Sequence, residues 1–289
     1  MTRSALFAGR PDGILCSEET ILIARITLLA VLIGTLGSHL AAAQPRAETL
    51  AAFENYVAQA ETRIRREQSS PESFLSTQLV AASPGEFEDR LRCGEVLVAK
   101  RGNSPVQVPG GLIHHWLGVV FIPDATIGQL LGVLQDYDHL VRYYRPEVMA
   151  SRLISRNGDQ FQISMRLRRH KVVTVVLDTE YDVHYGRLDA AHQYSLSRST
   201  RVIEIANPGQ RDEHPVAGGN DHGFMWRLNT YWRFVQAADG VVVECEAISL
   251  TRNVPAGLGW LIGPFIQNIP RESLEFTLTS TRNALAAKR

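Results

Sequence analysis

The sequence predicts an α+β fold in which a curved antiparallel sheet wraps around one long C-terminal helix. Segments within residues 148–205 alternate apolar and polar side chains, as strands with one buried face do. The dipeptides Asn157-Gly158 and Asp239-Gly240 separate such segments and favour tight hairpin turns. Residues 270–289 repeat apolar side chains at helical spacing, which predicts a helix that needs a large surface to pack on.

The composition excludes several classes of function. The chain has 289 residues, and its 30 basic and 30 acidic side chains cancel. This balance lacks the basic footprint of a nucleic-acid-binding protein. The sequence also lacks the H-E-x-x-H, G-x-S-x-G, P-loop and dinucleotide-binding patterns, and no Cys/His cluster indicates structural zinc. We therefore expect no nucleic-acid partner, no metal and no cofactor.

Residues 1–43 have the pattern of a secretory signal peptide. An apolar core over residues 21–36 follows a basic flank, and Ala41-Ala42-Ala43 offers a small-residue cleavage site. We expect cleavage after Ala43 and a periplasmic or secreted protein. A retained N-terminal anchor is the alternative.

Residues 44–90 are expected to form an N-terminal helix and a connector, ahead of a ligand-binding domain over residues 91–289. Leu50, Phe53 and Val57 begin an apolar stripe at helical spacing. This stripe predicts a surface helix over residues 48–68 with one apolar face. The Ser-, Pro- and Gly-rich remainder is interpreted as the connector.

Helices and strands are expected in a definite order after this connector. Residues 126–144 carry the apolar stripe of one helix or a broken pair, which Asp124 or Thr126 can cap. The last helix is expected to begin near Asn268, after an apolar loop over residues 255–266. The expected strands are residues 94–100, 112–122, 148–155, 160–169, 171–185, 194–205, 224–235 and 241–251.

The last hairpin predicts which side chains share a face. If Asp239-Gly240 forms the turn, large rings on one strand lie opposite small side chains on the other. Such a face suits packing against a helix or a ligand. The other face holds a charge pair that we expect to be exposed to water. The facing pairs would be Trp232 with Ala247, Phe234 with Cys245 and, on the other face, Arg233 with Glu246.

The most specific stretch runs from Ile127 to Asp159. A short helix there ends at Asp136-Tyr137, a second turn leads to Tyr143-Tyr144, and Pro146-Glu147-Val148 opens the next strand. With the order of elements over residues 111–285, this stretch resembles the START-like helix-grip (SRPBCC) superfamily. That superfamily includes polyketide cyclase/dehydratase-like, aromatase/cyclase and lipid-transfer proteins. The resemblance implies a hydrophobic cavity between sheet and last helix, in a fold that hosts carriers and enzymes alike.

Aromatic side chains on one strand face and in the apolar loop are the expected ligand-binding residues. A fully packed core is the alternative for them. The small side chains opposite the rings favour a hollow, in which Tyr137, Thr230 or Ser249 would orient a polar group. The ligand-binding candidates are Trp116, Tyr137, Met165, Tyr181, Trp226, Thr230, Trp232, Phe234, Ser249, Trp260 and Phe265.

Histidine, basic and acidic clusters have simpler explanations than a catalytic or metal site. His114 and His115 are adjacent in a strand, so they point to opposite faces and cannot easily hold one metal ion. The basic cluster is expected to be a solvated edge, with a contact to anionic lipid head groups as the alternative. An acidic and basic group near the last turn is interpreted as surface ion pairing rather than catalysis. The basic cluster is Arg166, Arg168, Arg169, His170 and Lys171, and the other group is Arg227, Arg233, Glu244 and Glu246.

Three hypotheses of function follow. The favoured one is an exported, non-catalytic carrier or sensor of a hydrophobic small molecule such as a lipid, isoprenoid or polyketide. The second is a cyclase/dehydratase-like enzyme that uses polar groups in the same cavity. Its acid-base candidates are His114, His115, Tyr181, Arg198 and Glu244. The third is an envelope-associated interaction module, in which the helix over residues 48–68 or the loop over residues 258–266 makes peripheral membrane contact.

Overall fold

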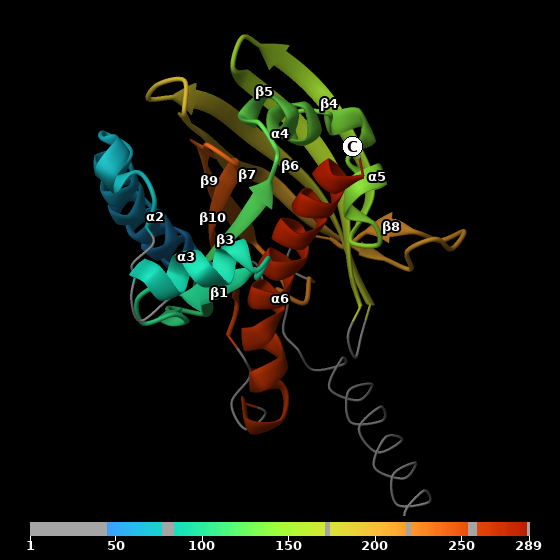
Figure 1. The fold of residues 1–289 in the computed structure, drawn as a ribbon. Helices are drawn as coiled ribbons and strands as arrows, with labels where there is room; N and C mark the ends of the chain where they lie inside the picture. Colours follow the sequence, from blue (N-terminus) through green and yellow to red (C-terminus); the bar gives the residue numbers. More distant parts are fainter. Residues whose placement is uncertain (1–44, 77–83, 171–173, 218–220, 254–258, 288–289) are drawn as a thin grey trace, which may run out of the picture. The chain divides into compact units, whose positions relative to one another are not determined.

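The computed structural model describes residues 45–76, 84–170, 174–217, 221–253 and 259–287, with the backbone alone for Pro84 and residues 259–267. The described residues belong to one compact unit (Figure 1). The expected signal peptide over residues 1–43 lies outside them.

A curved, unclosed antiparallel sheet dominates the unit (Figure 1). Among the described residues its strands run in the order β1-β3-β10-β9-β7-β6-β5-β4, while β2 pairs with β3 and β8 with β7. The expected α+β fold with a long C-terminal helix is confirmed. The strands are β1 (Leu97–Lys100), β2 (Val106–Val108), β3 (Gly111–Pro123), β4 (Val148–Asn157), β5 (Gln160–His170), β6 (Thr174–Arg187), β7 (His192–Ala206), β8 (His214–Pro215), β9 (Arg227–Ala237) and β10 (Gly240–Arg252).

Helices precede the sheet, interrupt it after β3 and follow it. The helix expected over residues 126–144 is broken into three pieces, and Thr126 caps the first through a capping box with Gln129. One part of the expected connector is helical instead, because residues 84–92 form α3. The helices are α2 (Ala47–Glu67), η1 (Pro71–Ser73), α3 (Pro84–Arg92), α4 (Ile127–Leu134), η3 (Tyr137–His139), α5 (Val141–Tyr144) and α6 (Gly259–Ala286).

The long helix α6 lies on one face of the sheet, which we call the inner face. At Gly118 of β3 the approach is close, since an added Cβ would lie 2.5 Å from the Leu278 Cδ1 atom. The Tyr144 hydroxyl lies 2.8 Å from the Thr281 hydroxyl, which ties α5 to α6. The expectation that this helix begins near Asn268 is wrong, because its helical backbone begins at Gly259 and includes much of the expected loop.

The opposite, outer face of the same strands is covered by α2. Phe53, Val57 and Ile64 of α2 are buried against Ile113 and Ile248 of the sheet. The apolar face expected for this helix is therefore an internal contact. This packing gives β3 and β10 two largely buried faces, and it buries the outer-face residues Asn229, Tyr231 and Arg233 of β9.

The last hairpin turns one residue earlier than expected. Ala237 pairs with Gly240, so Ala238 and Asp239 form the loop. Every predicted partner is consequently displaced by two residues, while the faces stay as predicted because a shift of two preserves them. The observed pairs are Trp232 with Cys245, Thr230 with Ala247 and Arg233 with Glu244.

Candidate functional site

Small side chains gather on the inner face of the central strands. Strand register places Ser197, Thr230 and Ala247 in one row across β7, β9 and β10. Neighbouring rows contribute three more serines on the same face, because residues two apart on a strand share a face. We call this set the small-residue patch: Ser195, Ser197, Ser199, Thr230, Ala247 and Ser249.

Large apolar side chains flank the patch on both sides. On the β3 side, Trp116 and Phe234 pack with Leu278 of α6. On the β4 side, Tyr137 and Tyr181 belong to a second cluster, which Phe276 of α6 also contacts. The helix therefore contacts both clusters between which the patch lies.

Part of the patch is only partly buried by the side chains that the structure describes. Ser197, Thr230 and Ala247 lie on strands that are hydrogen-bonded on both sides, yet each is only partly buried. Trp232, in the adjacent row, is also partly buried. Ordinary cores leave few such gaps, so the exposure marks accessible space above the patch.

Buried polar atoms without a partner lie on this same face. Among the described residues, the His114 Nδ1, Trp116 Nε1 and Ser151 Oγ atoms have no hydrogen-bond partner. Each such atom costs about 1–3 kcal/mol when it is buried. Burial also lowers the pKa of His114 to about 4 and raises that of Tyr181 to about 12, so both are neutral at pH 7.

The structure divides the predicted ligand-binding residues into groups. Trp226 lies apart from the others, because it packs against α2 on the outer face and its Nε1 donates to Asp221 at 3.0 Å. The side chains of Trp260 and Phe265 lie outside the described residues. The inner face holds Trp116, Tyr137, Met165, Tyr181, Thr230, Trp232, Phe234 and Ser249.

The acid-base candidates are also divided between the two faces. His114 and Tyr181 lie on the inner face, while His115 and Glu244 lie beneath α2 on the outer face. Arg198 pairs with Glu61 of α2, so it too is on the outer side. The expectation that His114 and His115 point to opposite faces is confirmed.

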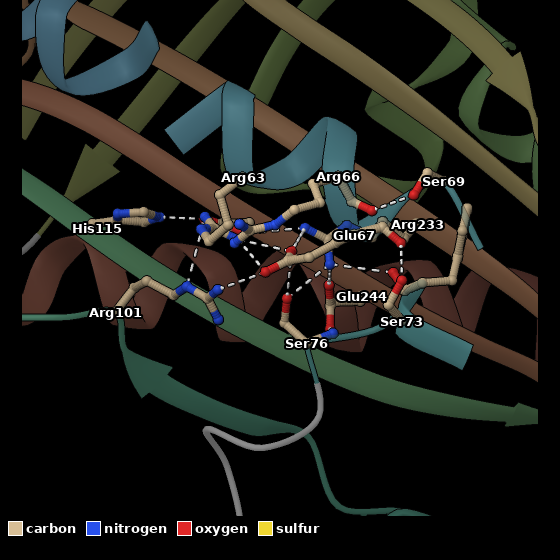
Figure 2. A network of polar contacts seen from close by, with 12 residues as sticks. Arg63, Arg66, Glu67, Ser69, Ser73, Ser76, Arg101, His115, Arg233 and Glu244 are labelled. Atoms are coloured by element: carbon tan, nitrogen blue, oxygen red, sulfur yellow. Dashed lines mark hydrogen bonds and ion pairs between the residues drawn. The ribbon is translucent and has the colours of Figure 1, made fainter. Parts of the chain in front are cut away.

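A buried network of charges joins α2 to the outer face (Figure 2). Arg233 lies at its centre, with its Nη1 atom 2.7 Å from Glu244 and its Nη2 atom 2.8 Å from Glu67 of α2. The Ser76 backbone N–H donates to Glu244 at 2.7 Å and so fixes the chain after α2. Arg233, Glu244 and Glu246 are all 0% exposed, so the expected exposed Arg233–Glu246 pair is wrong.

Within this network, two consecutive hydrogen bonds link Tyr56, His115 and Glu246 and determine which nitrogen of His115 carries the proton. The His115 Nε2 atom lies 2.5 Å from Glu246, and the Tyr56 hydroxyl lies 2.8 Å from His115 Nδ1. Burial lowers the pKa of His115, although Glu246 opposes this shift. A neutral His115 therefore donates to the Glu246 carboxylate and accepts from Tyr56. Arg63 of α2 also pairs with Glu246.

The two glutamates of β10 are shifted in opposite directions. Burial raises the pKa of Glu244 to about 7, although Arg233 opposes this. Burial would also raise the pKa of Glu246, but the His115 hydrogen bond and the charges of Arg63 and Arg233 lower it to about 2. Glu246, held so firmly ionised, is a poor proton donor, and its pairing with Arg63 ties β10 to α2.

The basic cluster on β5 is largely paired within the molecule. Arg166 contacts Asp178 and Glu213, each at 2.7 Å, and Arg169 pairs with Glu147. Lys171 lies outside the described residues. Contact with anionic lipids stays a prediction.

Neither a metal cluster nor a membrane-spanning helix is present in the described residues. No group of three or more His, Cys, Asp and Glu side chains there is placed to hold a metal ion. None of the helices in the described ranges has the length and apolar character needed to cross a bilayer.

No protein-family profile and no curated protein matches the chain, but solved structures resemble it. The STAR-related lipid transfer protein from Xanthomonas axonopodis is 20% identical over 72% of this chain and 98% of its own, with a TM-score of 0.45. Human STARD10 is 12% identical over 84% and 82%, with a TM-score of 0.45. Zhui aromatase/cyclase from a Streptomyces species is 12% identical over 60% and 94%, with a TM-score of 0.41. The chain's own elements, a curved antiparallel sheet with a long C-terminal helix along it, form the START-like helix-grip fold that the sequence resemblance implied.

Proposed function

We propose that this protein binds an apolar small molecule on the inner face, above the small-residue patch and beside α6. The observation that carries the proposal is the partial exposure of Ser197, Thr230 and Ala247 at the centre of the sheet. Side chains this small leave room, and the flanking rings of Trp116 and Tyr181 supply apolar walls. Convergent apolar walls with few polar groups are typical of small-molecule sites.

Burial of the ligand's apolar surface supplies most of the affinity in this proposal. Each Å² removed from water contributes about 25 cal/mol. The unpartnered Nδ1 atom of His114 and Nε1 atom of Trp116, two positions apart on β3, then favour a ligand with one polar end over a pure hydrocarbon, because that end can satisfy one of them.

Binding without catalysis is the form of the proposal that the geometry favours. An enzyme of the cyclase/dehydratase kind needs acid and base groups that converge on one substrate. His115, Glu244 and Arg198 are separated from the inner face by the sheet itself. His114 and Tyr181 share the inner face, but burial moves the pKa of His114 to about 4 and that of Tyr181 to about 12, both far from the neutral pH at which proton transfer is most efficient.

A filling substitution tests the proposal. Ser197→Leu places a larger side chain in the patch, whereas Thr200→Leu on the same strand changes an exposed position on the outer side and serves as the matched control. We expect Ser197→Leu to weaken binding of the neutral fluorescent probe Nile red at least about tenfold, because overlap with filled volume removes the apolar contact. We expect Thr200→Leu to bind the probe as the wild type does.

Two results of this experiment would contradict the proposal. If the wild type does not bind Nile red, or if both variants bind it equally, the inner face is not the site. Circular dichroism and thermal melting of both variants establish that each is folded before binding is compared.

We also propose export, with cleavage near Ala43. The basic flank, the apolar core over residues 21–36 and the Ala41-Ala42-Ala43 sequence support it. Expression of the full chain, followed by fractionation and N-terminal sequencing, tests this proposal. A mature N-terminus at Gln44 in the exported fraction is expected, and an uncleaved chain in the cytoplasm contradicts it.

A further inference from the structure

His114 presents a bare nitrogen to the interior of the inner face. Its Nε2 atom lies 3.0 Å from the Thr251 hydroxyl oxygen, and that hydroxyl donates its proton to the Arg252 carbonyl at 3.3 Å. A hydroxyl has only one proton, so the proton in the His114–Thr251 bond belongs to Nε2. The Nδ1 atom is consequently an acceptor, and it has no partner among the described residues.

Trp116 offers the complementary group on the same face. It follows His114 by two positions on β3, so the two side chains share a face and start about 7 Å apart. The Trp116 Nε1–H group can only donate, and within the described ranges it has no acceptor. Both residues are at least 95% buried, at 1% and 5% exposure.

We propose that the polar end of the ligand is a hydroxyl group, which donates to His114 Nδ1 or accepts from Trp116 Nε1–H as it enters the inner face. This inference rests on the proposed function and names its ligand class: apolar alcohols. A hydroxyl is the smallest common uncharged group that can both donate to His114 and accept from Trp116. A carbonyl offers His114 nothing, because it cannot donate.

A carboxylate is the informative competitor. It would meet a neutral His114, since burial lowers the pKa of that ring to about 4 and the charge of Lys100 adds to the shift. Two acceptors facing each other repel, so a carboxylate is disfavoured at Nδ1. The exposed Lys100 ammonium, 5.6 Å from the centre of the Trp116 ring, would instead attract the carboxylate. Repulsion at His114 Nδ1 therefore favours an alcohol over an acid of equal length, whereas attraction to Lys100 favours the acid.

Displacement of Nile red by dodecan-1-ol, dodecanoate and dodecane tests the inference. We expect the wild type to bind the alcohol about tenfold more tightly than either competitor, the effect of about one hydrogen bond to a buried group. The variant His114→Gln keeps a polar group near the Nε2 position and removes Nδ1, so it should lose most of this preference. The variant His114→Asn keeps a polar group near the Nδ1 position and should retain it. Trp116→Phe removes the indole N–H together with part of the ring, so it should weaken binding of the alcohol more than binding of dodecane, which reports the lost apolar contact alone.

Each outcome decides between the two proposals. Equal displacement by the alcohol and the acid, or an alcohol preference that His114→Gln and Trp116→Phe both leave intact, overturns the hydroxyl assignment while the apolar site stands. If Nile red does not bind, the proposed function fails and the ligand class fails with it. If His114→Gln does not fold, the Trp116→Phe comparison decides the question.

Discussion

Arg233 and Glu244 form an ion pair at 2.7 Å in which neither side chain is accessible to solvent. The pair lies beneath α2, where Glu67 and Ser76 accept further hydrogen bonds from the guanidinium group. A buried pair of this kind contributes little net stability, because desolvation offsets the attraction. Removal of one partner is nevertheless costly, since it leaves the other charge buried and alone.

Arg233→Met is therefore expected to destabilise the protein by about 3–5 kcal/mol, because Glu244 and Glu67 lose their shared partner. Urea unfolding measures the change. Arg201→Met is the matched control, since Arg201 pairs with Glu180 on the exposed side of the sheet and should change stability by less than about 1 kcal/mol. Equal, small effects of both substitutions would show that the network is not buried in solution.

The pKa of Glu244 predicts a loss of stability at neutral pH. Burial raises it from 4.5 to about 7, so the folded state prefers the protonated acid. This contribution is fully present below pH 4.5 and is lost as the pH rises through 7. The free energy of unfolding of Glu244→Gln should therefore fall less than that of the wild type between pH 5 and 8. Parallel pH profiles would contradict the assignment.

A glycine substitution tests how closely α6 lies on the sheet. In Gly118→Ala the new methyl would lie 2.5 Å from Leu278 Cδ1 and 3.0 Å from Leu274 Cγ. We expect a loss of about 1–3 kcal/mol from overpacking. Gly132→Ala in α4 is the control, because nothing lies within 4 Å of its added methyl and alanine favours helix by about 0.5–1 kcal/mol. Thermal melting of the two variants should show shifts of opposite sign.

Local patterns predicted much of the fold. Asn157-Gly158 marks a true hairpin, in which Gly158 has a φ of 58°. Thr126 caps its helix because the threonine and Gln129 form a reciprocal pair that is visible in the sequence. In the last hairpin, the Asp239-Gly240 signal placed the turn one residue too late, because the overlapping loops Ala238-Asp239 and Asp239-Gly240 both fit the sequence. The faces were still correct, so the inner-face rings could be identified without the register.

The charged network could not be predicted from the strand pattern. Alternation shows that Arg233 and Glu246 share a face, but it does not show that a helix about 170 positions earlier covers that face. The one available signal was the apolar stripe of residues 48–68, which requires a surface to pack on. The unpartnered atoms of His114 and Trp116 could not be predicted either, because they depend on three-dimensional packing that residue spacing does not determine.

Photo-crosslinking with a diazirine-labelled dodecanol is the most direct test of ligand binding on the inner face. Mass spectrometry of the digested adduct should place the label within residues 195–199, 228–232 and 245–249, where β7, β9 and β10 carry the small-residue patch. Excess unlabelled dodecan-1-ol should suppress this labelling. Label confined to α2 or to exposed strand faces, or label that the competitor does not suppress, would contradict the account.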